Sequence, residues 1–374
     1  MRVLSVFGTR PEAVKMAPVV QALAAAPDIE SKVCVTAQHR EMLDQVLQVF
    51  SIQPHFDLDL MRPDQCLTEL AAEILLHINP VLKEFKPDWV LVQGDTTTVM
   101  AVSLACFYNR IHVGHVEAGL RTGNRWQPFP EEINRKIAGV TADLHLAPTE
   151  HARRNLLAEG VADWRIVVTG NPVIDALRQV AALPVPAEIA KLMDRLEIGP
   201  GRKKLILVTA HRRENFGEPL EEAFSALKEL AHVYRDQAQF VYPVHLNPNV
   251  QEPARRILNS IDNFTLLPAQ DYLAMVHLMK KSTLVLTDSG GIQEEATSLG
   301  IPTLVMRSTT ERPEGVEAGV LKLVGTDREI IVRETRHLLD DPRAYAAMAS
   351  AKNPFGDGQA AGRILQAIRD FQER

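Results

Sequence analysis

The fold of this chain is decided most clearly by the stretch Leu284-Val-Leu-Thr-Asp-Ser289-Gly290-Gly291-Ile-Gln-Glu294-Glu295. An apolar run typical of a buried strand ends at Asp288, and Ser-Gly-Gly then opens a helical run. Glycines let a ligand approach the backbone, and the free N–H groups at a helix start suit a phosphate or diphosphate. The same pattern also occurs as a plain turn between a strand and a helix, so the rest of the chain must decide.

Short apolar strands alternate with longer helical segments along the whole chain, which is typical of parallel α/β layers. The strands are nearly continuous runs of Val, Ile and Leu, as expected when both faces of a sheet are covered. We expect strands at 2–7, 32–36, 88–93, 111–116, 144–147 and 165–169, and again at 204–209, 239–244, 264–267, 284–287, 301–306 and 320–324. The sequence therefore predicts an α/β protein with two doubly wound, Rossmann-like parallel-sheet domains flanking a cleft.

The domain boundary is expected in the Pro- and Gly-containing segment 171–203. We assign residues 1–172 to an N-terminal domain and 173–355 to a C-terminal domain. Residues 356–374 read as a turn followed by an amphipathic helix, which we expect to pack back on the N-terminal domain.

Composition narrows the class of protein. The net charge of -6 argues against a broad nucleic-acid-binding face, and three scattered cysteines are too few for a disulfide framework or a zinc site. A strand starts at Arg2, which leaves no room for a signal peptide, and no apolar run reaches the roughly 18 residues of a membrane span. We expect a cytoplasmic protein that binds neither nucleic acid nor membranes.

Polar groups collect after the expected strands of the first half, where open parallel sheets bind ligands. Arg10 and Lys15 follow the first strand, and Arg10 either pairs with Glu12 at the surface or meets an anionic ligand. No G-x-G-x-x-G follows this strand, so we expect no nicotinamide cofactor.

Three carboxylates are candidates for acid–base chemistry. Asp95 and Glu117 follow neighbouring strands, and Glu131 lies in a Pro-Glu-Glu sequence. Asp95 could instead cap a helix, and Pro-Glu-Glu is an ordinary helix start. Acids gathered at one sheet edge raise each other's pKa values, as proton-transfer catalysts require.

The second half supplies hydrogen-bond donors at its strand ends. His211 and His245 each follow a strand, and Arg312 follows another. The histidines lack the spacing of metal ligands, so we expect them to serve a diphosphate or to donate a proton.

Taken together, these segments resemble the non-hydrolysing UDP-N-acetylglucosamine 2-epimerases of bacteria over essentially the whole length. The resemblance rests on GTRPEAVKMAP (8–18), AQHREMLDQVL (37–47), GDTTT (94–98), HVEAGLRTG (115–123), PEEINR (130–135), HRREN (211–215), HLNP (245–248), DSGGIQEE (288–295), TTERPEG (309–315) and NPFGDG (353–358). It implies the glycosyltransferase-B-like fold, a homodimer, and inversion at C2 of the sugar to give UDP-N-acetylmannosamine for bacterial surface polysaccharides. The family eliminates UDP to form a 2-acetamidoglucal and then adds UDP back, which requires neither metal nor other cofactor.

The resemblance also implies roles for particular residues. Acid–base or catalytic roles fall on Asp95, Glu117, Glu131 and His211. Contacts to the nucleotide sugar fall on Arg10, Lys15, Gln270, Met275, Ser289, Gly290, Gly291, Glu295 and Arg312, with Glu295 holding the ribose. Met275 stands where some relatives carry Phe, and Ser308 replaces a frequent Asp.

Bacterial members bind a second UDP-N-acetylglucosamine as an allosteric activator. The matching residues here are Gln38, His39, Glu41 and His245. The same stretch also reads as a plain polar helix start. Four alternative functions remain: an epimerase acting on another UDP-sugar such as a diacetamido uronic acid, a hydrolysing epimerase that releases free N-acetylmannosamine, a glycosyltransferase, and a non-catalytic nucleotide-sugar sensor. The sensor would need no acid cluster.

Overall fold

The computed structural model describes residues 1–36, 40–60, 62 and 65–371, and it divides into two compact units. Unit 1 comprises Met1–Arg178 and Phe355–Arg374, and unit 2 comprises Gln179–Pro354. The boundary expected after residue 172 falls at the start of helix α7 (Pro172–Ala181). Among the described residues, no helix is both long and apolar enough to cross a membrane.

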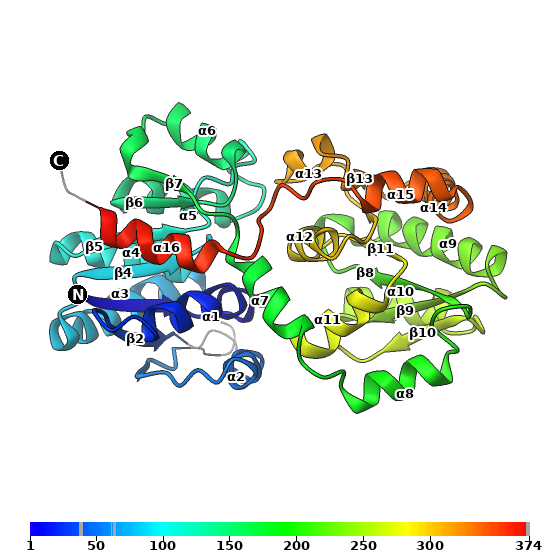
Figure 1. Ribbon diagram of the computed structural model, residues 1–374, viewed down its shortest axis with the longest axis horizontal. Coiled ribbons are helices and arrows are strands. Elements are labelled where there is room, and N and C mark those ends of the chain that lie inside the picture. The colour runs from blue at the N-terminus through cyan, green and yellow to red at the C-terminus, as the bar shows by residue number, and fades with distance from the viewer. Residues whose placement is uncertain (37–39, 61, 63–64, 372–374) are drawn as a thin grey trace. The chain divides into compact units, whose positions relative to one another are not determined.

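Unit 1 is built on a seven-stranded parallel sheet with the order β3-β2-β1-β4-β5-β6-β7 (Figure 1). Its strands are β1 (Arg2–Phe7), β2 (Glu30–Val35), β3 (Phe56–Asp57), β4 (Trp89–Gln93), β5 (His112–Val116), β6 (Leu144–Ala147) and β7 (Ile166–Val168). Its helices are α1 (Arg10–Ala24), α2 (Arg40–Val49), α3 (Leu67–Phe85), α4 (Thr97–Asn109), α5 (Glu131–Thr141), α6 (Glu150–Ala158), the short η1 (Asp163–Arg165), the first part of α7, and α16 (Ala360–Asp370).

Unit 2 is built on a six-stranded parallel sheet with the order β10-β9-β8-β11-β12-β13. Its strands are β8 (Lys204–Thr209), β9 (Ala238–Pro243), β10 (Phe264–Leu267), β11 (Leu284–Thr287), β12 (Thr303–Val305) and β13 (Leu321–Leu323). Its helices are α8 (Ala187–Arg195), η2 (Arg213–Asn215), α9 (Glu218–Val233), α10 (Pro248–Leu258), α11 (Tyr272–Lys281), α12 (Gly290–Ser298), α13 (Pro313–Glu317), α14 (Arg328–Asp340) and α15 (Pro342–Ala349).

Both sheets reverse their strand order at one point, between β1 and β4 in unit 1 and between β8 and β11 in unit 2. Open α/β sheets bind ligands beyond the carboxyl ends of the strands at such a switch point. The segments that leave these four strands are residues 8–10, 94–95, 210–212 and 288–291. These segments contain many of the site residues expected from the sequence.

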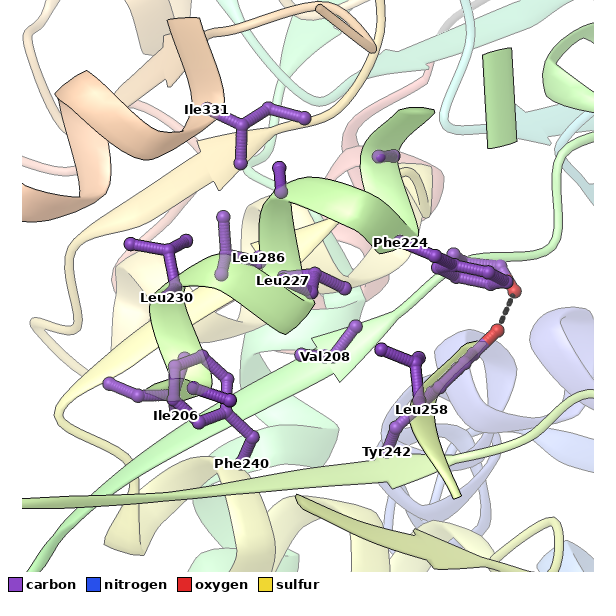
Figure 2. Close-up of a cluster of buried hydrophobic side chains, with 14 of the residues drawn as sticks. Ile206, Val208, Phe224, Leu227, Leu230, Phe240, Tyr242, Leu258, Leu286 and Ile331 are labelled. Carbon is purple, nitrogen blue, oxygen red and sulfur yellow. Dashed lines mark hydrogen bonds between the residues drawn. The ribbon is translucent and has the colours of Figure 1, made fainter. Parts of the chain in front are cut away.

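The core of unit 2 shows why the apolar runs form buried strands. Ile206 and Val208 on β8 lie under Leu227 and Leu230 on α9, and all four are fully buried (Figure 2). Burying an aliphatic side chain of this size stabilises the fold by about 1.5–3 kcal/mol. The hydroxyl of Tyr242 donates to the carbonyl of residue 210 at 2.6 Å, so this polar group in the core is satisfied.

The last helix belongs to the first unit. Helix α16 lies alongside α1 (Figure 1), and the guanidinium of Arg369 donates to the carboxylate of Asp28. The backbone N–H groups of Ala360 and Ala361 at its start donate to the Asp175 carboxylate at 3.2 and 3.0 Å. The chain therefore returns to unit 1 after completing unit 2.

Two buried histidines make the stability of unit 1 depend on pH. His115 and His145 are register partners on β5 and β6, and both are buried. Burial lowers the pKa of His115 to about 4 and that of His145 to about 3, while a histidine in the unfolded chain titrates near its ordinary value of about 6.5. Between those values only the unfolded state binds the proton, so stability is full above about pH 6.5 and falls as the pH drops.

We expect the free energy of unfolding to fall between pH 6.5 and pH 4 by about 1.4 kcal/mol per pH unit for each histidine. Urea titrations at a series of pH values measure this slope. Both ring nitrogens of His145 lack hydrogen-bond partners among the described residues. His145→Leu should therefore fold, and the slope of its unfolding free energy against pH should be smaller by the contribution of one histidine, about 1.4 kcal/mol per pH unit. An identical slope in the variant would show that other groups cause the acid sensitivity.

Candidate active site

Strand β1 leads into α1 through a tightly bonded turn. The Thr9 side chain caps α1, and the Glu12 carboxylate accepts the backbone N–H groups of Gly8 and Thr9 at 3.0 and 2.7 Å. Its other oxygen accepts from the Thr96 hydroxyl at 2.7 Å, which ties the turn after β1 to the turn after β4. Burial raises the pKa of Glu12 despite these hydrogen bonds. Glu12 is thus a structural acid that fixes the turn directly before Arg10, the first residue of α1.

Glu117 is the most strongly held carboxylate of unit 1. It follows β5 with a left-handed backbone, at φ 64°, a conformation that is uncommon for a residue with a side chain. The Lys15 ammonium lies 2.6 and 2.7 Å from its two oxygens, and the amides of Asn171 and Gln93 donate at 2.9 and 2.5 Å. Lysine and amide NH₂ groups can only donate, so both Glu117 oxygens act as acceptors here. Backbone strain at a buried charged group is typical of functional sites.

Asp95 follows β4 and is held by α5. The Arg135 guanidinium donates to one Asp95 oxygen from Nε at 3.0 Å and from Nη2 at 2.6 Å. The Asn134 amide donates to the Asp95 backbone carbonyl at 2.9 Å. The interpretation of Asp95 as a helix cap is wrong, because Thr96 is the N-cap of α4. Asp95 therefore keeps a partly exposed carboxylate beside a cation.

The two adjacent glutamates at the start of α5 differ in role. Glu132 is buried and accepts backbone N–H groups from Thr122 and Gly123 at 3.2 and 3.1 Å. It also pairs with Arg135 at 3.1 Å. Glu132 therefore anchors the loop before α5 and orients the guanidinium that holds Asp95. Glu131, the first residue of α5, is left as the candidate acid of this pair.

In unit 2, two arginines converge on the start of α12. A Cβ atom added to Gly290 would lie 2.9 Å from Nη1 of Arg312 and 3.3 Å from Nη2 of Arg212. Ser289 is the N-cap of α12, and its side chain makes no capping hydrogen bond. A helix N-terminus beside two guanidinium groups is suited to bind an anion such as a diphosphate. This geometry favours the ligand-binding interpretation of the Ser289-Gly290-Gly291 turn over the plain turn.

The two glycines of this turn provide a matched pair of variants. The Cβ of Gly290→Ala would displace Arg212 and Arg312, whereas the Cβ of Gly291→Ala would meet only Glu295 Oε2 at an ordinary 3.7 Å. We expect Gly290→Ala to raise the Kd for UDP about tenfold through the loss of a charged hydrogen bond, with Gly291→Ala changing it less. Isothermal titration of both variants measures the difference. Equal effects would mean that the arginines do not bind the anion.

Glu294 and Glu295 differ in their hydrogen-bond partners. The guanidinium of Arg312 donates to Glu294 and, at 3.2 Å, to Glu311, so Glu294 belongs to a buried ion-pair network. Glu295 instead accepts from the hydroxyl of Tyr272 at 2.7 Å. Glu295 therefore accepts from a neutral hydroxyl group, whereas Glu294 is paired with a cation.

His211 leaves β8 beside a buried acid. Its Nδ1 lies 3.3 Å from Oδ1 of Asp288, and its ring stacks on that of His245 with centroids 5.4 Å apart. The backbone N–H groups of His211 and Arg212 both donate to Oδ2 of Asp288 at 2.8 Å. Unit 2 thus brings His211, His245 and Arg212 together at its switch point.

The remaining expected residues lie on or before α11, or outside the described part. Met275 is on α11, partly buried, one turn after Tyr272, and the Gln270 amide donates to the Pro268 carbonyl at 2.8 Å. Gln38 and His39 lie outside the described residues, and the side chain of Glu41 on α2 does as well. Among the described residues, no group of three or more His, Cys, Asp or Glu side chains could hold a metal ion.

Sequence reasoning missed several supporting residues. Gln93 and Asn171 hold Glu117, Arg135 holds Asp95, and Tyr272 holds Glu295. Asp288 was visible as a strand end but received no role. Its strand-end position was the only signal that could have marked it.

Comparisons with known proteins agree on one family. A family model described as UDP-N-acetylglucosamine 2-epimerase matches residues 21–369. The protein of that name from Escherichia coli (strain K12) is 58% identical over 375 residues, covering 99% of each chain. The one from Bacillus subtilis (strain 168) is 51% identical, covering 98% of this chain and 95% of that one.

Solved structures give the same result. The crystal structure of UDP-GlcNAc 2-epimerase from Neisseria meningitidis bound to UDP-GlcNAc has a TM-score of 0.92 at 48% identity, covering 99% of this chain and 100% of that chain. The expected fold class, two parallel-sheet α/β domains of the glycosyltransferase-B-like type, is confirmed. The chain belongs to the UDP-N-acetylglucosamine 2-epimerase family.

Proposed function

We propose that this protein interconverts UDP-N-acetylglucosamine and UDP-N-acetylmannosamine without releasing the sugar. The observation that carries the proposal is the division of acidic and basic groups between the two units. Unit 1 presents Asp95 and Glu117 directly after neighbouring strands and Glu131 at the start of α5, and unit 2 places Arg212 and Arg312 at the start of α12. The first set suits proton transfer and the second suits a diphosphate.

The chemistry explains why both sets are needed. The C2 proton of this sugar has no neighbouring carbonyl, so simple deprotonation costs too much. In the proposed route a carboxylate of unit 1 takes the C2 proton while the bond from C1 to the diphosphate oxygen breaks, with its electron pair going to oxygen. The products are UDP and a 2-acetamidoglucal. Protonation of C2 on the other face and return of the diphosphate oxygen to C1 complete the inversion.

The proposed roles of single residues in binding the nucleotide sugar are supported by contacts within each unit. Ser289, Gly290, Gly291 and Arg312 hold the diphosphate, and His211 lies at the same switch point. Glu295, presented by Tyr272, accepts hydrogen bonds from the ribose hydroxyls. The resemblance further assigns Gln270 and Met275 to the nucleotide in unit 2, and Arg10 and Lys15 to the substrate in unit 1. In the structure, Lys15 is paired with Glu117.

We also propose activation by a second molecule of UDP-N-acetylglucosamine, with Gln38, His39, Glu41 and His245 as its contacts. The support from the structure is the stacking of His245 on His211 within unit 2. A ligand that contacted His245 would restrain the ring of His211. The three free cysteines fit a reducing, cytoplasmic compartment, and synthesis of bacterial surface polysaccharide is the proposed use of the product.

The proposed assembly is a homodimer. The exposed apolar residues of α4 and its neighbouring helices are the observation that supports this proposal. This helix carries no charged side chain, yet Phe107 and Tyr108 are 62% and 70% exposed. On its neighbours α3 and α5, Leu76 and Val140 are 68% and 84% exposed. Apolar exposure on three adjacent helices is typical of a surface that a partner covers.

We expect the protein to sediment as a dimer and Tyr108→Asp to sediment as a monomer, because a buried unpaired charge opposes association. Analytical ultracentrifugation measures both. Val233→Asp, on an exposed apolar residue of unit 2, is the control and should stay dimeric. A dimer that persists in Tyr108→Asp would place the contact elsewhere.

Incubation with UDP-N-acetylglucosamine and no added cofactor tests the activity. ¹H NMR should show UDP-N-acetylmannosamine and the same final ratio when the reaction starts from either sugar. Release of free N-acetylmannosamine would show a hydrolysing enzyme instead. A UDP-diacetamido uronic acid, the competing substrate, should give a lower kcat/KM. No conversion of either would refute the proposal.

A further inference from the structure

Asp288 is a fully buried carboxylate that joins the two loops at the switch point of unit 2. It directly follows β11, and its side chain is inaccessible to solvent. Oδ2 accepts the backbone N–H groups of His211 and Arg212, each at 2.8 Å, and the Asp288 carbonyl accepts from Nε of Arg212 at 3.2 Å. One oxygen of this carboxylate is therefore occupied by the loop that follows β8.

The second oxygen of Asp288 faces the ring of His211. Oδ1 is buried without a standard hydrogen bond among the described residues, and Nδ1 of His211 lies 3.3 Å from it. A small rotation of the partly exposed imidazole turns this pair into a good hydrogen bond. A buried carboxylate oxygen left unmatched costs free energy, so an N–H at Nδ1 is the favoured state of the ring.

The surroundings hold this pair in place. The hydroxyl of Tyr242 donates to the carbonyl of residue 210, directly before His211, at 2.6 Å. The backbone N–H of Ser289, directly after Asp288, donates to Oγ1 of Thr287 at 2.9 Å. On its outer side the His211 ring stacks against His245. The backbone on both sides of the pair is thus hydrogen-bonded, and the ring of His211 lies between Asp288 and His245.

We propose that Asp288 is a positioning residue for His211: it holds the Nδ1 proton and thereby directs Nε2 of His211 toward the diphosphate. The inference rests on the proposed function, in which His211 serves the departing UDP. When the bond from C1 to the diphosphate oxygen breaks, that oxygen gains negative charge. Nε2, once it has taken a second proton from solvent, can then donate a hydrogen bond to that oxygen, while Asp288 balances the positive charge of the doubly protonated ring. In hydrolytic triads, too, a buried carboxylate accepts the Nδ1 proton of the histidine and orients its ring.

Asp288→Asn separates the two functions of the carboxylate. The amide oxygen of Asn can keep both backbone hydrogen bonds, which puts its NH₂ group where Oδ1 now faces Nδ1. An NH₂ group donates, so the ring must give up its Nδ1 proton and carry it on Nε2. We expect the ¹⁵N-detected tautomer of His211 to invert. We expect kcat to fall about 100- to 10,000-fold because Nδ1 must then accept from the amide, so the ring cannot become the doubly protonated, charged donor, with the Kd for UDP changing less than about tenfold.

The wild-type spectrum is the first measurement, made on the full-length, histidine-¹⁵N-labelled protein with and without UDP. A ring that carries a proton on Nδ1, alone or together with Nε2, supports the proposal, and a ring protonated on Nε2 alone overturns it even if Asp288→Asn does not fold. In the folded variant, an unchanged tautomer or a wild-type kcat also overturns it. The spectrum needs no turnover, so a protein that fails to epimerise the sugar would defeat the proposed function without deciding the role of Asp288.

Discussion

Glu117→Gln is expected to lower kcat by about 100- to 10,000-fold and to destabilise unit 1. Each Glu117 oxygen accepts from two donors: Oε1 from Lys15 and Asn171, and Oε2 from Lys15 and Gln93. Whichever way the glutamine amide turns, its NH₂ group faces two donors and breaks both hydrogen bonds. Leaving buried donors unmatched costs about 1–3 kcal/mol, which thermal or urea unfolding would detect.

The binding of UDP gives the internal check on this variant. The residues proposed to hold UDP lie in unit 2, so the Kd for UDP should stay close to that of the wild type. Glu159→Gln is the matched control, because Glu159 also pairs with a cation, Arg121 at 2.7 Å, but lies outside the acid cluster. Full turnover in Glu117→Gln would make Glu117 a structural residue only.

Asp95→Asn should lower kcat by a similar factor without the loss of stability. The Arg135 hydrogen bonds to Asp95 fall on a single oxygen, Oδ2. The asparagine oxygen can take that place, and Arg135 also retains its partner Glu132. The variant therefore keeps the local geometry and removes only the ability to accept a proton. Steady-state kinetics and a melting curve together measure the contrast with Glu117→Gln.

A low melting temperature in Asp95→Asn would contradict this account, because it would show that the charge of Asp95 supports the fold. A kcat equal to that of the wild type would exclude Asp95 from proton transfer. In that event Glu131, at the start of α5, becomes the remaining carboxylate to test.

The fold could be predicted from the sequence because its signal is local. Long runs of Val, Ile and Leu mark strands that are covered on both faces, and twelve of them were expected where the sheets place strands. The exception is β3, Phe56–Asp57, which pairs with Cys34 and Val35 at the sheet edge. Two residues are too few to show a period, and only the neighbouring strand makes them a strand.

The site could be predicted only in part because its supporting contacts are distant in sequence. Asp95, Glu117 and Ser289 follow strands and were visible as strand ends. Asn171, which donates to Glu117, is 54 residues away along the chain. Likewise, the loop that binds Asp288 precedes it by 77 and 76 residues. Such partners are set by tertiary packing, and spacing in the sequence does not reveal them.

The position of the sugar's C2 hydrogen tests the central claim most directly. The protein would be incubated with UDP-N-acetylglucosamine in D₂O and the C2 position followed by NMR as the manno sugar forms. Loss of the C2 proton to a carboxylate and reprotonation on the other face predict deuterium at C2 of the product. A UDP-N-acetylmannosamine product that retains its original C2 proton would contradict the proposed acid–base mechanism.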